Sequence, residues 1–320
     1  MPTHLVARVR ATLAAVTAVT AVVAPTAIPS APGAHSTAVA PKAARVISAA
    51  TPGATPLHES GASPAGAIVD SEVVPVTHLA PEPIAARRVV LYGDSLAWEA
   101  RDFFTRALAS ALITQVTTRT FGGTAICDWL GQMRADAASL RPDAVVVEFS
   151  GNALTPCMRA PNGSALTGAT YFQKYASDSA AVLDIFSSRH TLVFFAGAPI
   201  SRDAERAGDP TAPTLHTLYA ALARSTPYGR YIDAGASVLA GGRWTATLPC
   251  LPTEPCMGGR DATGTPVNVV RAPDGVHFCP SALPAVRGVT APCSVWASGS
   301  WRFGNAMAAP VIAEFESRPQ

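Results

Sequence analysis

A serine stands at a point where a buried strand is expected to end and a helix to begin. The apolar run of residues 89–92 ends at Gly93, and Asp94 and Ser95 follow before an amphipathic pattern starts. A hydroxyl at such a junction lies beside outward-pointing backbone N–H groups, which stabilise developing negative charge. Ser95 is therefore a candidate nucleophile, and a serine that only caps the helix is the alternative.

A serine nucleophile needs a base, and the base needs an acid that orients it. Of the seven histidines, four lie in the first 86 residues. His190 falls at a helix–strand junction and His216 within a helix, and we favour a structural role for both. His277 follows Asp274 by three residues in a loop with proline and glycine. This spacing lets the carboxylate face one imidazole nitrogen while the other faces the serine. Asp274 and His277 are the candidate acid and base, and an incidental pair in a surface loop is the alternative.

Strands and helices in alternation must position these side chains. Strands are expected at residues 88–92, 115–121, 144–149, 191–196 and 230–233, with a last strand or loop edge at 267–271. Helices are expected after residue 95 and over 128–140, 171–188, 213–224 and 301–315, the last disturbed at Pro310. Residues 237–266 have an irregular pattern. Long apolar runs such as 144–149 are typical of strands buried on both faces of a parallel sheet. The pattern predicts an α/β fold, a three-layer α/β/α sandwich with a mainly parallel central sheet.

Two further strand ends carry residues that can serve a serine nucleophile. Gly122 and Gly123 follow the second expected strand, and Asn152 follows the third. The carboxyl ends of parallel strands meet at one edge, where ligands bind in such sheets. We therefore expect a hydroxyl, a glycine backbone and an amide side chain at the same edge.

Four motifs in this order give the chain a family likeness. Gly-Asp-Ser-Leu, a glycine after the second strand, Gly-Asn after the third and Asp-x-x-His near the C-terminus make it resemble the SGNH hydrolase superfamily, also called the GDSL family. The resemblance covers about residues 87–316 and implies a flavodoxin-like fold. It assigns the nucleophile to Ser95, the base to His277, the acid to Asp274, and the oxyanion hole to Asn152 and to Gly123 or Gly122, with Gly123 preferred.

Some neighbouring residues bear on this resemblance. Ala153 follows Asn152 where many members have an acid, so the resemblance implies no local hydrogen bond that steadies this loop. Asp94 is expected to support the turn and not to be the triad acid. Trp98 and Trp129 can line an acyl or sugar pocket, although core packing is favoured.

Six cysteines, an even number, suggest disulfides if the chain is exported. A bridge from Cys127 to Cys157 would tie together the two proposed oxyanion-hole loops. The natural local pairs are Cys250 with Cys256 and Cys279 with Cys293, and other pairings stay open. A zinc site is disfavoured because the spacing lacks a paired Cys-x2-Cys. No metal or cofactor is expected.

The N-terminus indicates export. Arg8 and Arg10 precede an uncharged run rich in Ala and Val, and small residues follow, so residues 1–34 are expected to be a signal peptide. The cleavage site is open, and an uncleaved anchor is the less favoured alternative. Residues 35–86, rich in Ala and Pro and without aromatics, are expected to be a disordered linker. Residues 87–317 are expected to form the hydrolase domain.

Charge and motifs together predict a class of function. The net charge of +2 leaves no basic field for nucleic acid. We expect a secreted, monomeric serine esterase without a stable membrane span, which acts on small-molecule or glycan O-acyl esters and can associate with the cell wall. An O-acyltransferase with the same triad and a non-catalytic wall-tethered binding module are the alternatives. The acyl chain and the alcohol are not predicted.

Overall fold

The computed structural model describes residues 87–278 and 296–317. Its centre is a five-stranded sheet in the order β2-β1-β3-β4-β5, and every pairing in it is parallel. The strands are β1 (Arg88–Gly93), β2 (Gln115–Thr120), β3 (Ala144–Glu148), β4 (Leu192–Ala196) and β5 (Gly229–Ile232). The order reverses at β1, and in such sheets ligands bind at the carboxyl ends beside the reversal.

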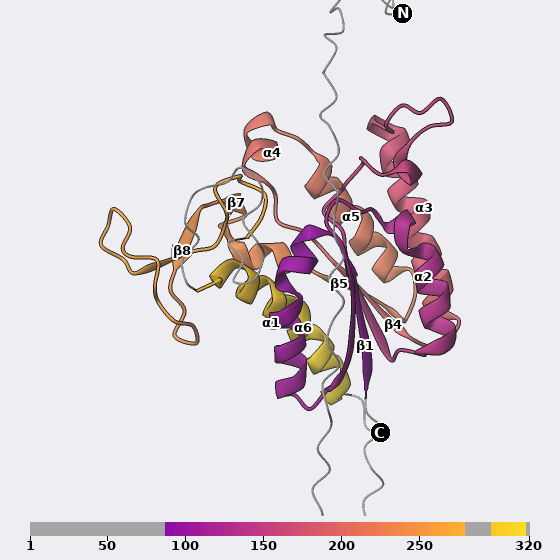
Figure 1. Ribbon diagram of the computed structural model, residues 1–320, viewed down its shortest axis with the longest axis horizontal. Coiled ribbons are helices and arrows are strands. Elements are labelled where there is room, and N and C mark those ends of the chain that lie inside the picture. The colour runs from indigo at the N-terminus through magenta and orange to yellow at the C-terminus, as the bar shows by residue number, and fades with distance from the viewer. Residues whose placement is uncertain (1–86, 279–295, 318–320) are drawn as a thin grey trace, which may run out of the picture. The chain divides into compact units, whose positions relative to one another are not determined.

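Helices cover both faces of the sheet (Figure 1). One face packs against α1 (Ser95–Ser110) and α6 (Ser298–Ser317), and the other against α2 (Ile126–Ser139), α3 (Gly168–Ser187) and α5 (Thr211–Arg224). Alternate residues of β1 serve the two sides: Val89 and Leu91 join the first core, and Val90 and Tyr92 the second. The predicted three-layer α/β/α sandwich with a parallel sheet is confirmed.

Some elements differ from the sequence-based expectations. Residues 237–266 are not wholly irregular, because they contain β6 (Leu239–Ala240), β7 (Arg243–Trp244) and β8 (Thr247–Pro249). β6 pairs with β7, and β8 with β9 (Val267–Val269), both antiparallel. Gly241 and Gly242 join β6 to β7 with φ values of 58° and 82°, a two-residue turn that glycine favours.

The helices also contain differences. α6 continues through Pro310 instead of being interrupted there, since proline removes only one hydrogen bond and the helix packs closely on α1. The structure adds the short helix α4 (Arg202–Ala207) and the 3-10 turns η1 (Pro156–Met158) and η2 (Ala234–Val238).

Several expectations lie outside the described residues. They are the signal peptide at 1–34, the linker at 35–86 and the pair Cys279–Cys293. Within 87–278 and 296–317, no helix has the length and apolarity needed to cross a bilayer.

Candidate active site

Ser95 is the first residue of α1, directly after β1. Gly93 makes the turn possible, since a Cβ there would lie 2.3 Å from the Ala97 Cβ and 2.7 Å from the Glu148 carbonyl oxygen. Asp94 caps the helix, because its Oδ1 accepts from the Leu96 N–H at 3.0 Å. The tight turn therefore presents Ser95, which is half-buried, at the carboxyl edge of the sheet.

His277 contacts both of its expected partners. Its Nε2 lies 3.0 Å from Ser95 Oγ, and its Nδ1 lies 2.7 Å from Asp274 Oδ2. The other carboxylate oxygen, Asp274 Oδ1, accepts from the backbone N–H groups of Val276 at 2.9 Å and His277 at 3.0 Å. The acid is thus fixed by its own loop, and the imidazole is fixed by the acid.

The contacts between Asp274 and His277 influence the protonation of both side chains. Burial acts to raise the pKa of Asp274, but the hydrogen bonds from the His277 side chain and from the loop backbone outweigh it and hold that pKa well below its usual range. The hydrogen bond to Asp274 raises the pKa of His277, against the opposing effect of burial. An ionised Asp274 therefore stabilises an imidazolium at His277.

The loop of Asp274 is held from outside. The Arg202 guanidinium donates to the Pro273 carbonyl at 2.9 Å, and the Arg202 backbone N–H donates to the Gly275 carbonyl at 2.9 Å. Gly275 has φ of 79°, and a Cβ there would lie 2.8 Å from the Arg202 Cβ, so the position requires glycine. Below the loop, Glu99 Oε2 accepts from the Phe278 N–H at 2.8 Å.

Asp94 links the serine turn to the loop after β3. Its Oδ2 accepts from the Ser150 N–H at 2.8 Å, from Ser150 Oγ at 2.6 Å and from Asn152 Nδ2 at 2.8 Å. An amide nitrogen has two hydrogens, so the second Asn152 hydrogen remains to donate elsewhere. Ala153 cannot accept a hydrogen bond through its side chain, and Asp94, 58 positions before Asn152, accepts from the Asn152 amide instead.

The glycine pair lies on the other side of Ser95. A Cβ built on Gly122 would lie 3.6 Å from the Ser95 Cβ, whereas Gly123 has φ of 78° and faces open space. Among the described residues, the backbone N–H groups of Ser95, Gly122 and Gly123 have no hydrogen-bond acceptor. These amides and the Asn152 amide are the donors available beside the serine hydroxyl.

Two buried glutamates beside the site were not predicted. Glu148 ends β3, and its Oε2 accepts from the Ala97 N–H at 3.0 Å; burial and then the nearby Asp94 raise its pKa well above the usual value. Burial raises the pKa of Glu99 to about 8. Both carry a sequence signal: Glu148 interrupts an apolar strand, and Glu99 falls on the buried face of α1 between Leu96 and Phe103.

The remaining aromatic and histidine candidates have other contacts. Trp98 lies beside Gly122 and under the Arg101 guanidinium, and Trp129 packs edge-on against Tyr92 in the core. His216 Nε2 lies 2.8 Å from the Ala198 carbonyl, and His190 stacks on Tyr228. Neither histidine is near Asp274, in agreement with the roles favoured from the sequence.

Two of the three expected disulfides fall within the described residues, and both are formed. Cys127 pairs with Cys157, and Cys250 with Cys256. The first joins the start of α2 to η1, next to the glycine loop and the Asn152 loop. Its two sulfurs are bonded to each other and are not free to bind a metal together with Asp128, the acid beside them.

A cavity of about 560 Å³ opens beside the serine. It begins at Leu96, Gly151 and Val276, which are neighbours of Ser95, Asn152 and His277 in the chain. Its lining combines apolar and polar side chains. The apolar and aromatic ones include Leu166, Tyr171, Phe172 and Pro210, and the polar ones Ser201, Asp209 and Thr211.

Residues 88–283 match the DUF459 family, described as proteins of unknown function. No curated protein matches the chain.

Several solved structures are similar to the chain. A GDSL-like lipase from Bacteroides thetaiotaomicron is 14% identical with a TM-score of 0.41, over 72% of this chain and 89% of that one. A lipase/acylhydrolase from Enterococcus faecalis is 17% identical with a TM-score of 0.34, over 50% and 87%. A catalytic mutant of an acetylxylan esterase from Geobacillus stearothermophilus is 11% identical with a TM-score of 0.37, over 47% and 77%. The roles of individual residues must therefore be argued from the site itself.

Proposed function

Because the chain belongs to the DUF459 family, whose proteins are of unknown function, we propose a function from its site: a serine esterase that hydrolyses carboxylic O-acyl esters. One observation carries the proposal. A single imidazole contacts a serine hydroxyl at 3.0 Å with one nitrogen and a carboxylate at 2.7 Å with the other. Ser95 and His277 lie 182 positions apart in the chain, so their contact does not arise from proximity in sequence.

The chemistry follows from these contacts. His277 Nε2 takes the proton of Ser95 Oγ as that oxygen attacks the ester carbonyl. Asp274 accepts from Nδ1–H throughout, so it fixes the tautomer and stabilises the imidazolium without taking the proton. His277 then returns the proton to the departing alcohol and an acyl-enzyme remains on Ser95. Water, deprotonated by the same nitrogen, releases the acid.

The oxyanion of each tetrahedral intermediate would be bound by four candidate donors. They are the backbone N–H groups of Ser95, Gly122 and Gly123 and the free hydrogen of the Asn152 amide. Each such donor typically contributes about 3–4 kcal/mol to the transition state. We assign the Asn152 amide a fixed position because Asp94 accepts its other hydrogen at 2.8 Å.

The adjacent cavity is the proposed site for the ester. Its apolar lining residues, such as Leu166 and Phe172, suit an acyl or alkyl group, and its polar ones, such as Ser201 and Asp209, suit a sugar or another hydroxylated alcohol. Two of the similar structures are named as a lipase/acylhydrolase and an acetylxylan esterase. Both names are consistent with a carboxylic ester substrate for this chain. Hydrolysis rates on a panel of short-chain, long-chain and acetylated-sugar esters show which acyl and alcohol groups the site prefers.

Export and a monomeric state belong to the same proposal. Disulfides persist in oxidising compartments, and the two found here support secretion. We propose residues 1–34 as a signal peptide, 35–86 as a linker and 87–317 as the catalytic domain. Residues lost on export are identified by mass spectrometry of the secreted protein, and its mass in solution gives the oligomeric state.

The central test replaces the nucleophile. Ser95→Ala should abolish hydrolysis of p-nitrophenyl acetate and labelling by a fluorophosphonate, because no other group forms the acyl-enzyme. Ser110→Ala is the matched control, since Ser110 ends the same helix and bonds only within it. A folded Ser95→Ala protein with full activity would contradict the proposal. Faster transfer to an added acceptor sugar than to water would contradict hydrolysis as the reaction.

A further inference from the structure

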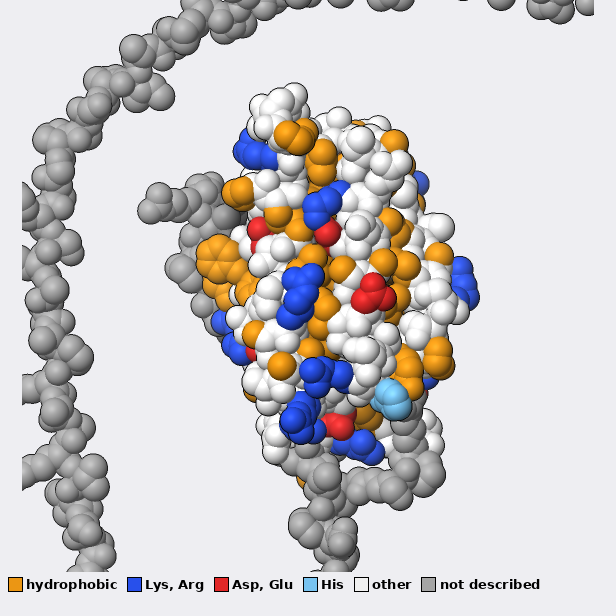
Figure 2. Space-filling model, turned by 90° about the vertical axis from the view of Figure 1, so that its right-hand side faces the viewer, with side chains coloured by type: hydrophobic (Ala, Val, Ile, Leu, Met, Phe, Trp, Pro, Cys, Tyr) orange, Lys and Arg blue, Asp and Glu red, His pale blue; other side chains and the backbone are white. Residues whose placement is uncertain are grey.

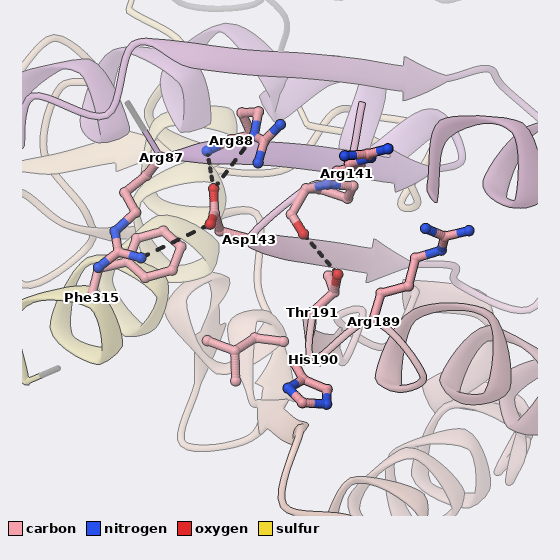
Figure 3. A pocket seen from close by; sticks show the side chains of 10 residues that line it. Arg87, Arg88, Arg141, Asp143, Arg189, His190, Thr191 and Phe315 are labelled. Carbon is pink, nitrogen blue, oxygen red and sulfur yellow. Dashed lines mark hydrogen bonds and ion pairs between the residues drawn. The ribbon is translucent and has the colours of Figure 1, made fainter. Parts of the chain in front are cut away.

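A second pocket lies at the opposite edge of the sheet from Ser95. It has a volume of about 510 Å³ and is formed where β1, β3 and β4 begin, with the end of α6 beside them. Figure 3 shows the side chains that line it, which come from these three segments and from α6. Its side chains are predominantly basic. The charged and aromatic lining residues are Arg87, Arg88, Arg141, Asp143, Arg189, His190 and Phe315.

The pocket holds four guanidinium groups and a single carboxylate. Asp143 forms ion pairs with the Arg87 guanidinium at 3.9 Å and the Arg88 guanidinium at 3.8 Å, and its Oδ2 accepts from the Arg88 backbone N–H at 2.7 Å. The guanidinium groups of Arg141 and Arg189 are exposed and have no hydrogen bond or ion pair among the described residues. Figure 2 shows the same concentration of charge, with Lys and Arg side chains gathered around an acid and beside a histidine at the lower end of one face.

The backbone at this pocket is held in an unfavourable conformation. Arg141 follows the C-cap of α2 with φ of 47°, and His190 follows α3 with φ of 63°. Helices commonly end with glycine or asparagine at such a position, because other side chains are strained there. The helix dipole favours a cation near each of these ends. The dipole effect is no larger than the backbone strain, and it does not explain Arg87 and Arg88, which lie just before β1 and at its first position.

We propose that this pocket binds a phosphate group. A guanidinium is planar and offers paired donors that match phosphate oxygens, and it stays charged at any physiological pH. The two unpaired guanidinium groups of Arg141 and Arg189, beside two that share one carboxylate, suit an anion that carries more than two acceptor oxygens. The volume is that of a small-ligand site, so it fits one phosphate group and its substituent. The phosphate belongs to a phosphate ester or to free phosphate, and the test separates these sources.

The site is independent of the proposed esterase activity. Parallel strands place Ser95 at their carboxyl ends and this pocket at their amino ends. Arg87 is the first described residue and directly follows the segment expected to be a linker. A phosphate-bearing polymer bound here would hold the domain while leaving the opposite edge open to substrate.

The test measures binding to the purified protein by calorimetry at low salt. The probes are inorganic phosphate, glycerol 3-phosphate and poly(glycerol phosphate), with acetate as a control anion. Arg141→Gln with Arg189→Gln should weaken phosphate binding more than about tenfold, since two charge-assisted contacts are lost. Arg206→Gln with Arg224→Gln removes the same charge from exposed sites elsewhere and should change binding by less than about twofold.

One further variant separates a ligand role from a structural one. Arg141→Gly relieves the left-handed backbone, so the melting temperature should hold or rise while phosphate affinity falls. Wild-type affinity in this variant, equal losses in both double variants, or no binding of any phosphate probe would each overturn the proposal. Tighter binding of acetate or of a DNA oligonucleotide than of the phosphate probes would also overturn it. Preference for the polymer over inorganic phosphate identifies the ester as the source.

Discussion

At the carboxyl edge of the sheet, Asp94, Asn152 and His277 each have a protein partner at hydrogen-bond distance. At the amino edge, the guanidinium groups of Arg141 and Arg189 have none among the described residues. The first edge carries buried acids and fixed side chains, and the second carries exposed cations. Both edges are built from loops between the same strands.

The difference shows two ways in which one sheet can prepare a site. Catalysis requires donors and acceptors fixed before substrate arrives, because reorganisation during the reaction costs rate. Binding of a charged group requires only that opposite charge be left available. Substitutions at the first edge should therefore be felt in the rate constant, and those at the second in affinity alone.

After loss of the nucleophile itself, the largest effect is expected from Asp274→Asn. The amide would favour the wrong imidazole tautomer and leave the imidazolium without its counter-charge, so kcat should fall about 10³–10⁴-fold. The measurement is the steady-state rate of p-nitrophenyl acetate hydrolysis, with circular dichroism to confirm folding. Asp102→Asn on the exposed side of α1 is the control. A loss below about tenfold would show that the carboxylate is not the orienting acid.

A smaller loss of kcat is expected when the Asn152 amide, or the acid that holds it, is replaced. Asn152→Ala removes one donor, and kcat should fall about 10²–10³-fold with little change in KM. Asp94→Asn should give part of this loss, because it replaces the acceptor that holds Ser150 and Asn152. If Asp94→Asn loses stability but keeps kcat, the acid has a structural role only.

The disulfides offer a comparison in stability. Removing Cys127–Cys157, whose residues are 30 positions apart, should lower the free energy of unfolding by about 3–4 kcal/mol in the chain-entropy model. Removing Cys250–Cys256, which closes only 6 positions, should lower it by about 2 kcal/mol. Urea unfolding of the two Cys→Ser double variants measures both. The reverse order would mean that local strain outweighs loop closure.

A pH profile tests the electrostatics of the carboxyl edge. The base must be neutral to accept a proton, and the hydrogen bond that His277 donates to Asp274 raises the pKa of His277. The acidic limb of kcat/KM should therefore lie above the ordinary imidazole value of about 6.5. In Asp274→Asn the limb of the residual activity should move to lower pH. A limb that stays in place would assign it to another group, such as Glu99.

The smallest effect is expected at the amino edge. Arg141→Gly should raise the free energy of unfolding by about 0.5–1 kcal/mol, because glycine accepts a φ of 47° without strain. Hydrolysis of p-nitrophenyl acetate should be unchanged. A clear loss of stability would show that the Arg141 side chain supports the fold, and the contrast between the edges would weaken.

The carboxyl edge was predictable because each of its motifs is local. An apolar strand followed by Gly93-Asp94-Ser95 fixes a turn, and three-residue spacing allows Asp274 to contact His277. The link from Asp94 to Asn152 was not predictable, since it joins loops 58 positions apart through tertiary packing. The ribbon of β6 and β7 had a usable signal in Gly241-Gly242, a favoured hairpin turn.

The amino edge carried no motif at all. The pair Arg87-Arg88 and the single cations Arg141 and Arg189 lie in three distant segments, and in sequence each is ordinary for a residue at the end of an element. Only the parallel register, which aligns the starts of β1, β3 and β4, brings them to one pocket. Convergence of this kind is a property of topology and not of spacing.

The span between Ser95 and His277 has a consequence for folding. Closing 182 positions costs more chain entropy than any neighbouring strand pairing, and contacts so distant in sequence form slowly. The sheet and helices α1 to α5 can therefore assemble before the loop of residues 272–278 and α6 dock, since α6 closes a still longer span onto α1. During refolding from denaturant, we expect helical circular dichroism to recover first and fluorophosphonate labelling of Ser95 to recover later. The rate at which labelling recovers then measures the last step of assembly.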